Sequence, residues 1–343
     1  MKALVKEKPA PGLSLLDIEI PQVTHSDDVQ FRVDCCAICL GELKVYDWNE
    51  WAAADVTLQL PTVLGHEAAG VVTAVGRNVA AFAPGDRVVV DPFISCGRCY
   101  QCRNGHHNMC AQREIYGKRR GAFAEYAVLP QHALCKLPDQ LSLEEGAVLE
   151  NLGIAVHAVE QEPHDAGDKA VVIGCGPIGI LAAQALAAQG VRVILTDMVA
   201  SRLSLAREIS GGTVMDIRQE NPLERIEAIT AGKRADFVLE AAATQSALDQ
   251  AFDLVRDRGT IVTIGTFNGP VSFNPFFKMT RREVRLVSSI GRTWETWRRM
   301  TQLIAAGKVN LRPLISHILP MERYHEGFEL AKSRDIMKVL LRP

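Results

Sequence analysis

The sequence predicts an α/β protein in which a β-rich domain precedes a doubly wound parallel sheet, and three observations lead to this fold class. Residues 1–150 are rich in short β-type runs that are separated by turn signals, such as Pro-Gly-Asp at 84–86. From about 155 to 292, apolar strands alternate with helical segments, which indicates a parallel sheet covered by helices. The 343 residues also suffice for two domains, each with its own core.

The elements of the second half follow from their apolar runs and from the residues that end them. The predicted strands lie at 170–173, 191–196, 236–240, 260–264 and 284–288. The predicted helices lie at 178–189, which Gly190 ends, and at 201–209. The last part of the chain predicts an amphipathic helix at 294–306, a second helix around 321–333 and a terminal strand at 338–341.

The composition is that of an ordinary globular protein. Apolar residues make up 48% and charged residues 23%, which excludes a disordered chain. The net charge of −2 argues against binding to nucleic acid or to a membrane surface, because both normally need a basic excess. We find neither the run of about 18 apolar residues that a membrane span needs nor the apolar segment of a signal peptide. The expected location is therefore the cytoplasm.

The nine cysteines point to metal binding or catalysis more than to disulfides, since their number is odd and no secretory signal is evident. Cys96, Cys99, Cys102 and Cys110 form the pattern C-x2-C-x2-C-x7-C. Four thiolates in one short loop can surround a tetrahedral Zn²⁺ and leave no open position, so this pattern predicts a structural zinc site. An iron–sulfur cluster is the alternative, because closely spaced cysteines also hold those clusters.

A glycine-rich turn predicts a dinucleotide site. The turn fits G-x-G-x-x-G, follows an apolar strand and opens a helix, so its backbone N–H groups and the helix N-terminus would face a pyrophosphate. The residues expected to bind the cofactor here are Gly174, Gly176, Pro177, Ile178 and Gly179.

Asp197 ends the next predicted strand, 18 residues after Gly179. A carboxylate at this position accepts hydrogen bonds from the ribose hydroxyls and repels a 2′-phosphate, which favours NAD over NADP. Arg202 is also expected to contact the cofactor. This residue favours NADP, because a nearby arginine can accommodate the 2′-phosphate of that cofactor.

A second metal site is dispersed along the first half. Cys39 follows a β run, His66 and Glu67 are adjacent, and Glu150 closes this half of the chain. One thiolate, one imidazole and one or two carboxylates can hold Zn²⁺ and leave room for a substrate. Taken singly, His66 is also compatible with a structural histidine, Glu150 with a carboxylate on a helix surface and Cys39 with a buried thiol.

The order of these motifs resembles the zinc-dependent medium-chain dehydrogenase/reductase family, also called the alcohol dehydrogenase family, over essentially the whole chain. Its most specific part is Gly65-His66-Glu67-x2-Gly70-x5-Gly76. The resemblance implies a GroES-like catalytic domain at 1–153 and a Rossmann dinucleotide-binding domain at 154–292. It also implies that the segment 293–343 returns to the catalytic domain.

The resemblance further implies the roles of individual residues. The ligands of a catalytic zinc would be Cys39, His66 and Glu150, with Glu67 as a ligand or a close neighbour that exchanges with Glu150 or water. Backbone groups at Ile264, Gly265 and Thr266 would bind the nicotinamide amide. Each chain would hold two zinc ions, one catalytic and one structural, together with NAD, and would assemble into a homodimer or homotetramer.

Within the family, two groups compete. The segments 46–51 (Tyr-Asp-Trp-Asn-Glu-Trp) and 291–297 (Gly-Arg-Thr-Trp-Glu-Thr-Trp) are similar to L-threonine 3-dehydrogenase. That group carries Cys-Gly-Thr-Asp-x-His after the first zinc ligand, whereas this chain has Cys-Leu-Gly-Glu-Leu-Lys at 39–44. The latter pattern, like the C-terminal segment 338–343, resembles polyol dehydrogenases of the erythritol/threitol type.

The departures put the proton relay in doubt. Gly41 has no side chain and stands where a hydroxyl would be, while Lys44 replaces the imidazole. A buried lysine near zinc has a lowered pKa and can act as a base, although Lys44 could also be a surface residue. Glu42 is expected to accept a hydrogen bond from His66 and to fix its tautomer.

Two classes of function therefore stay open. The first is an NAD-dependent, zinc-containing dehydrogenase that oxidises a secondary alcohol of a small polyol or sugar-like substrate, with L-threonine 3-dehydrogenase as the close alternative. The second is a non-catalytic NAD-binding redox or metabolite sensor, which the altered segment after Cys39 suggests.

Overall fold

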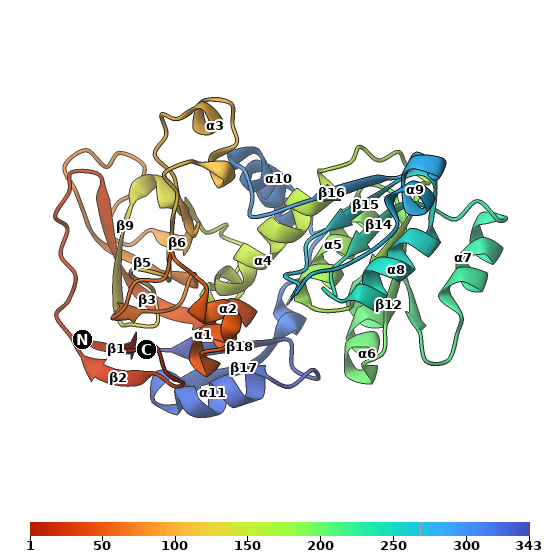
Figure 1. Ribbon diagram of the computed structural model, residues 1–343. Coiled ribbons are helices and arrows are strands. Elements are labelled where there is room, and N and C mark those ends of the chain that lie inside the picture. The colour runs from red at the N-terminus through yellow and green to blue at the C-terminus, as the bar shows by residue number, and fades with distance from the viewer. Residues whose placement is uncertain (268) are drawn as a thin grey trace. The chain divides into compact units, whose positions relative to one another are not determined.

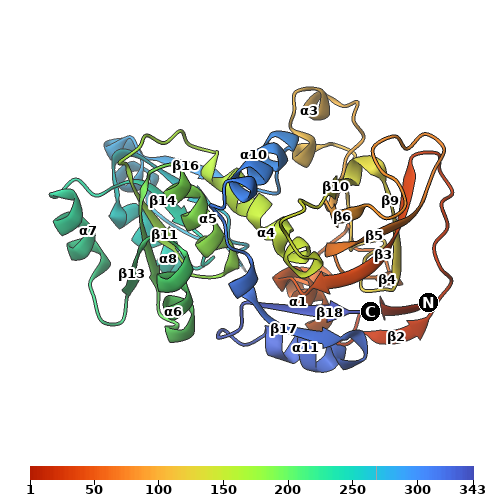
Figure 2. The same ribbon diagram turned by 180° about the vertical axis from the view of Figure 1, so that it is seen from behind.

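The computed structural model describes residues 1–267 and 269–343, which form two compact units. The first unit consists of Met1–Glu150 together with Leu314–Pro343, and the second of Asn151–Pro313. Figure 1 and Figure 2 show the elements of each unit from two sides. The sheets described below confirm the expected order of a β-rich unit followed by a parallel sheet.

The first unit is built mainly on antiparallel pairs of strands, and only β17 and β18 of this unit pair in parallel within the described residues. Its largest sheet has the order β10-β6-β5-β3-β18-β17, with β9 also paired to β3, and smaller sheets have the orders β2-β1-β4 and β7-β8. These strands are β1 (Lys2–Lys6), β2 (Ser14–Asp17), β3 (Asp28–Ala37), β4 (Thr62–Val63), β5 (Glu67–Val75), β6 (Arg87–Val90), β7 (Phe93–Ile94), β8 (Glu114–Ile115), β9 (Tyr126–Pro130), β10 (Leu134–Lys136), β17 (Ile315–Pro320) and β18 (Lys338–Arg342).

Strand β3 organises this unit because it pairs with three other strands. It is antiparallel to β5, to β9 and to β18, and Phe31 and Val29 on it are fully buried. Residues that alternate between buried and exposed along β3 explain why one face of the sheet packs on the core. The pairing of Leu340 with Ala37 brings the last strand of the chain next to the segment that leads into Cys39.

Short helices connect the strands of the first unit. They are α1 (Leu40–Asp47), α2 (Glu50–Ala53), α3 (Tyr100–Arg103) and α11 (Tyr324–Ala331), and the long helix α4 (Leu143–Val159) runs from this unit into the second. Tyr46 on α1 stacks on Phe328 of α11, with ring centroids 4.4 Å apart, and this contact connects the C-terminal helix to the N-terminal part of the first unit.

Short 3₁₀ turns occur in both units, at His107–Met109, Gln131–Ala133, Thr280–Arg282, Arg312–Leu314 and Met321–Arg323.

The second unit is a parallel sheet of the order β13-β12-β11-β14-β15-β16. Its strands are β11 (Lys169–Ile173), β12 (Arg192–Asp197), β13 (Thr213–Asp216), β14 (Ala235–Glu240), β15 (Val255–Thr263) and β16 (Arg285–Ser288). Its helices are α5 (Pro177–Ala188), α6 (Ala200–Ile209), α7 (Pro222–Thr230), α8 (Gln245–Leu254), α9 (Pro275–Lys278) and α10 (Trp294–Ala305). The near-continuous burial of the central strands is that of a sheet covered on both faces.

The expected boundary at 293 is wrong, because the return to the first unit begins only at Leu314. Helix α10 belongs to the second unit, since Thr296 donates a hydrogen bond of 2.8 Å to Glu160. The fully buried Arg292 packs beside Gly153, where an added Cβ would lie 2.6 Å from its Cδ. No helix in the described part of the chain is long and apolar enough to cross a bilayer.

Candidate functional site

The four cysteines of the predicted structural site come together in the loop between β7 and β8. Their sulfur atoms all lie within 4.8 Å of one another. Cys99 Sγ is 3.5 Å from that of Cys102 and 3.9 Å from that of Cys110. Thiolates that surround a tetrahedral zinc at about 2.3 Å are separated by roughly 3.8 Å, so the geometry fits such an ion.

The backbone of the same loop stabilises thiolates. The Sγ atom of Cys110 accepts N–H groups from Cys96 and Gln112, each at 3.3 Å. Backbone N–H groups of Cys102 and Ala111 lower the pKa of Cys99 to about 6. Burial and the neighbouring thiol of Cys99 raise the pKa of Cys102 to about 12, so the loop favours the thiolate, the form that binds metal, at Cys99 but not at Cys102.

A second group that could hold a metal consists of Cys39, Glu42 and His66, whose donor atoms lie within 4.8 Å of one another. Cys39 follows β3 and precedes α1, while His66 directly precedes β5. The antiparallel register that pairs Ala37 with Glu67 brings these two segments together. Two residues that are 27 positions apart therefore meet through the sheet.

Glu42 links the other two members of this group. One of its oxygens accepts the backbone N–H of Cys39 at 2.7 Å, and the other lies 2.5 Å from Nδ1 of His66. Burial lowers the pKa of His66, but the charges and contacts of Glu42 and Cys39 together outweigh this effect and raise that pKa well above its usual value. With Nδ1 in contact with Glu42, the Nε2 atom is the one that is available to a metal, which is the usual arrangement of a metal-binding histidine.

The two further acidic residues, Glu67 and Glu150, lie outside the 4.8 Å group, and both are buried, with exposed fractions of 1% and 8%. Both oxygens of Glu67 lie close to Nζ of Lys338, at 2.7 and 2.5 Å. Glu150 comes from α4, and its charge acts on both Glu67 and Lys338. Four protein groups of the kinds zinc accepts are thus gathered in the first unit: Cys39, His66, Glu67 and Glu150.

Lys44 lies on α1, one turn beyond Cys39, and only 7% of it is exposed. Its Nζ lies 5.0 Å from the centre of the Trp51 ring and has no hydrogen-bond partner among the described residues. Burial lowers the pKa of this lysine, which favours the neutral amine. A Cβ added at Gly41, on the same helix, would have no neighbour within 4 Å outside the helix backbone, so there is space for a side chain at this position.

The glycine-rich turn has the geometry of a phosphate-binding loop. Gly174 follows β11 with φ of +104°, a conformation that side chains disfavour. Gly176 caps α5, and Pro177 is its first residue. A Cβ at Gly179 would lie 1.9 Å from the carbonyl oxygen of Gly174, so only glycine lets the helix pack against the turn.

Asp197 is fixed at the end of β12 by three backbone groups. Its Oδ2 accepts the N–H of Cys175 at 2.7 Å, while Oδ1 accepts those of Met198 and Val199 at 2.6 and 2.9 Å. A carboxylate offers about four acceptor directions, so one remains for a ribose hydroxyl. The Nη1 atom of Arg202 lies 3.8 Å from where a Cβ of Gly176 would be, which places a cation beside the loop.

The remaining cofactor candidates follow β15. The backbone N–H of Ile264 donates to the carbonyl of Glu240 at the end of β14, at 3.1 Å, and Gly265 and Thr266 come directly after it. Since β11, β12, β14 and β15 run parallel, their carboxyl ends share one edge of the sheet. In doubly wound sheets, dinucleotides generally bind at such an edge, at the point where the strand order reverses, and here β11 lies at that point between β12 and β14.

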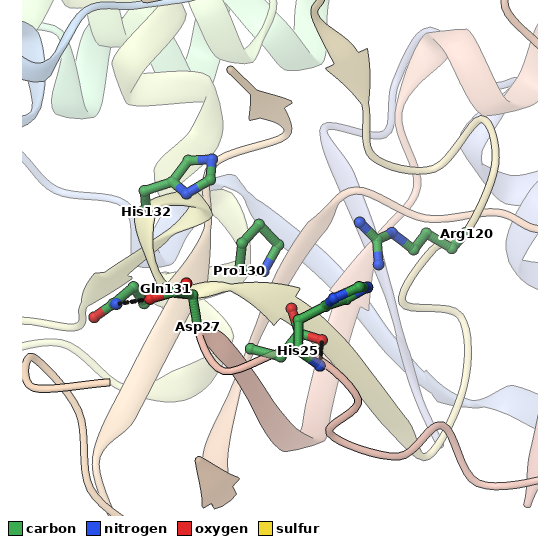
Figure 3. A pocket seen from close by; sticks show the side chains of 7 residues that line it. His25, Asp27, Arg120, Pro130, Gln131 and His132 are labelled. Carbon is green, nitrogen blue, oxygen red and sulfur yellow. Dashed lines mark hydrogen bonds between the residues drawn. The ribbon is translucent and has the colours of Figure 1, made fainter. Parts of the chain in front are cut away.

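A pocket of about 680 Å³ lies elsewhere in the first unit, and none of its lining residues is a predicted site residue. Figure 3 shows that several of its polar groups already bind one another. Gln131 donates to Asp27 at 3.1 Å, and the backbone N–H of His25 donates to Asp28 at 3.1 Å. The residues that line it are His25, Asp27, Asp28, Arg120, Pro130, Gln131 and His132. We assign no function to this pocket.

Comparison with known proteins decides the family. Residues 25–139 match the alcohol dehydrogenase GroES-like domain, and residues 177–306 match the zinc-binding dehydrogenase domain. The L-threonine 3-dehydrogenase of Bacillus subtilis (strain 168) is 34% identical, over 100% of this chain and 99% of its own length. The chain belongs to the zinc-dependent medium-chain dehydrogenase/reductase family. As a member of this family, the chain is an NAD-dependent, zinc-containing dehydrogenase.

Solved structures of other family members agree with this assignment. The 2R,3R-butanediol dehydrogenase of Bacillus subtilis superimposes with a TM-score of 0.88 and 28% identity, covering 100% of this chain and 99% of its own. A zinc-binding dehydrogenase of Sinorhizobium meliloti 1021, bound to NADP, gives a TM-score of 0.90 and 29% identity, with coverage of 100% and 99%. The four-cysteine loop and the Cys39–Glu42–His66 group accordingly fit a structural and a catalytic zinc.

Proposed function

We propose that this dehydrogenase transfers hydride from a secondary alcohol of a small polyol or sugar-like substrate to NAD. The observation that carries the proposal is the Cys39–His66 pair, held by Glu42 in the arrangement that a zinc-binding thiolate and imidazole need. The glycine-rich loop and Asp197 supply the cofactor site that the same reaction requires.

Individual residues of the chain would have different roles in this reaction. Cys39, His66 and a carboxylate from Glu150 would hold a zinc ion, and that ion would supply Lewis-acid activation of the substrate hydroxyl. Glu42 orients His66 through Nδ1. The glycine-rich loop binds the pyrophosphate of NAD, and the backbone at 264–266 binds the nicotinamide amide.

The proton of the alcohol leaves by water, by Glu67 or by Lys44, because Gly41 has no side chain to pass it on. Lys44 is the residue whose role a substitution tests best. A base is active as the neutral amine, so turnover carried by Lys44 should rise with pH through its lowered pKa. We therefore expect Lys44→Met to lower kcat by about 10–100-fold and to remove that rise from the pH profile of kcat. An unchanged profile would exclude Lys44 from the proton route.

The substrate is tested by the formation of NADH, followed by absorbance, with a panel that contains erythritol, threitol, other small polyols and L-threonine. The Cys-Leu-Gly-Glu-Leu-Lys segment at 39–44 supports a polyol. The 34% identity to an L-threonine 3-dehydrogenase supports L-threonine as the second candidate. Turnover confined to L-threonine would refute the polyol proposal. If no alcohol were oxidised by the zinc-loaded chain, a non-catalytic sensor would be the better description.

The preference for NAD over NADP is a further expectation. Asp197 would repel a 2′-phosphate, whereas Arg202 would attract it, and Asp197 ends β12, which is where the ribose is expected to bind. We expect a KM for NAD at least about tenfold below that for NADP, and we expect Asp197→Ser to narrow this ratio. A lower KM for NADP in the unchanged chain would contradict the role given to Asp197.

The partners follow from the same proposal. A small-molecule alcohol is the substrate, and neither nucleic acid nor a membrane is expected as a partner. We also propose a homodimer or homotetramer and a cytoplasmic location, and light scattering of the purified chain tests the first of these.

A further inference from the structure

Two lysines of the first unit lie beside the same tryptophan ring. The Nζ atom of Lys44 is 5.0 Å from the centre of the Trp51 ring, and that of Lys118 is 5.5 Å from it. Lys44 comes from α1, Trp51 from α2 and Lys118 from the loop after β8. Both nitrogens lie within the distance at which an ammonium is attracted to an aromatic ring. Three separate segments thus gather N–H donors around Trp51.

This group is held close to the proposed metal site. Lys118 follows Gly117, where an added Cβ would lie 3.3 Å from Cβ of His66. Gly121, at the other end of the same turn, packs on the backbone two residues before His66. The backbone N–H of Gln59 donates to the carbonyl of Lys118 at 2.9 Å, which joins the turn to the loop after α2. Lys118 is therefore fixed near the place where the substrate hydroxyl would bind.

The donors of this group are not all used within the described part of the chain. The Nζ atom of Lys44 is buried and has no hydrogen-bond partner there, and it can donate as an amine or as an ammonium. Lys118 directs two of its three N–H groups to Asp55, at 2.6 Å, and to Thr57, at 3.0 Å. The adjacent Arg119 is exposed and forms no ion pair. Asp55 therefore leaves both N–H donors and positive charge without an acceptor.

We infer that the substrate carries an acidic group, a carboxylate or a phosphate, which binds to Lys118 and Lys44 beside Trp51. The inference rests on the proposed function and names the class of its substrate more closely. The oxygens of an acidic group accept hydrogen bonds strongly, and their charge complements the surplus cations of the loop. The hydroxyls of a neutral polyol would not balance that charge.

The first test compares the best neutral polyol with its acid and its terminal phosphate, for example erythritol, erythronate and erythritol 4-phosphate. We expect the unchanged chain to have the lowest KM for one of the two acidic alcohols, and the two arms tell the carboxylate from the phosphate. Lys118→Gln should raise the KM for that alcohol about tenfold more than the KM for erythritol. The amide of this variant still donates to Asp55 but carries no charge.

Asp55→Asn should change the same constant in the opposite direction. Without the competing carboxylate, Lys118 is free for the substrate, so we expect the KM for the acidic alcohol to fall by about threefold. This variant also serves if Lys118→Gln does not fold. The matched control is Lys136→Gln on β10. Lys136 also pairs with an aspartate, Asp86, at 3.0 Å, and lies 6.0 Å from the ring of Phe82, and its substitution should change each KM by less than about twofold.

Inorganic phosphate is a probe that does not depend on turnover. Titration calorimetry of the zinc-loaded chain should show that phosphate binds about tenfold more weakly to Lys118→Gln and more tightly to Asp55→Asn. Phosphate should also compete with the alcohol in steady-state kinetics. Competition with NAD alone would mean that a phosphate of the cofactor occupies this group, and it would overturn the inference.

Two further results would also overturn it. One is a KM for erythritol below those for both acidic alcohols in the unchanged chain. The other is an equal effect of Lys118→Gln on the neutral and the acidic alcohols. A chain that shows the expected pattern of phosphate binding but oxidises no alcohol would contradict the proposed function and leave the site for an acidic group standing.

Discussion

His66→Ala is expected to lower kcat/KM for the alcohol substrate by at least about a thousandfold. The imidazole is one of the groups that would hold the catalytic zinc, and a Lewis acid contributes several kcal/mol to the stabilisation of a developing alkoxide. Each 1.36 kcal/mol that is lost lowers the rate tenfold. The measurement is the steady-state formation of NADH with the best substrate of the panel.

A matched control separates loss of the ligand from loss of the fold. His106 is exposed in the four-cysteine loop, and His106→Ala should leave kcat/KM within about twofold of the unchanged chain. The kcat/KM of Glu42→Gln should lie between those of His66→Ala and His106→Ala. The amide of this variant still contacts Nδ1 of His66 but no longer carries the negative charge. Near-normal turnover of a folded His66→Ala variant would show that His66 is not a ligand.

Cys102→Ser is expected to have the largest effect on stability. The substitution removes one of four thiolates that surround the structural zinc, so that ion should be lost and the loop between β7 and β8 should lose its order. If about 3 kcal/mol of stabilisation is lost, the Tm should fall by roughly 6–12 °C, given about 2–4 °C per kcal/mol for a unit of this size. Differential scanning calorimetry together with zinc analysis checks both effects.

The control for this variant is Cys135→Ser on β10, outside the four-cysteine loop. It should keep both zinc ions and shift the Tm by much less. The catalytic zinc should stay bound in Cys102→Ser, because its proposed ligands come from other segments. If Cys102→Ser kept two zinc ions and its original Tm, the four-cysteine loop would not be a structural metal site.

The fold could be predicted from the sequence where local signals decide it. Gly and Pro turns separate the strands of the β-rich half, and the strand–helix alternation of the second half repeats over a long stretch. Helix α1 was not predicted, because it has only eight residues, includes Gly41 and lacks a clear apolar face. Helix α4 was missed because its residues are apolar on most sides, which gives no period.

The boundary before the C-terminal segment failed for a different reason. Helix α10 was predicted, but its amphipathic pattern does not say which unit its apolar face covers. Contacts of Thr296 and Arg292 with residues more than 130 positions earlier in the chain decide this. Such contacts leave no local trace in the sequence.

In the candidate site, too, the part made by neighbouring residues could be predicted and the part made by distant residues could not. Four cysteines within 15 positions can reach one ion from a single loop, so their spacing alone indicates a metal site. The meeting of Cys39 and His66 depends on the β3–β5 register, and only the family resemblance pointed to it. The pairing of Lys338 with Glu67 spans 271 positions and was not predicted, although a lysine followed by three apolar residues in a terminal strand is a weak signal for a buried ion pair.

The zinc content of the purified chain tests the account most directly, when it is measured for the unchanged protein and for Cys39→Ser. We predict two ions per chain in the unchanged protein and one in the variant, with the remaining ion held by the four-cysteine loop. A fully loaded, unchanged chain that binds the dinucleotide but holds only one zinc ion, all of it in that loop, would contradict the account.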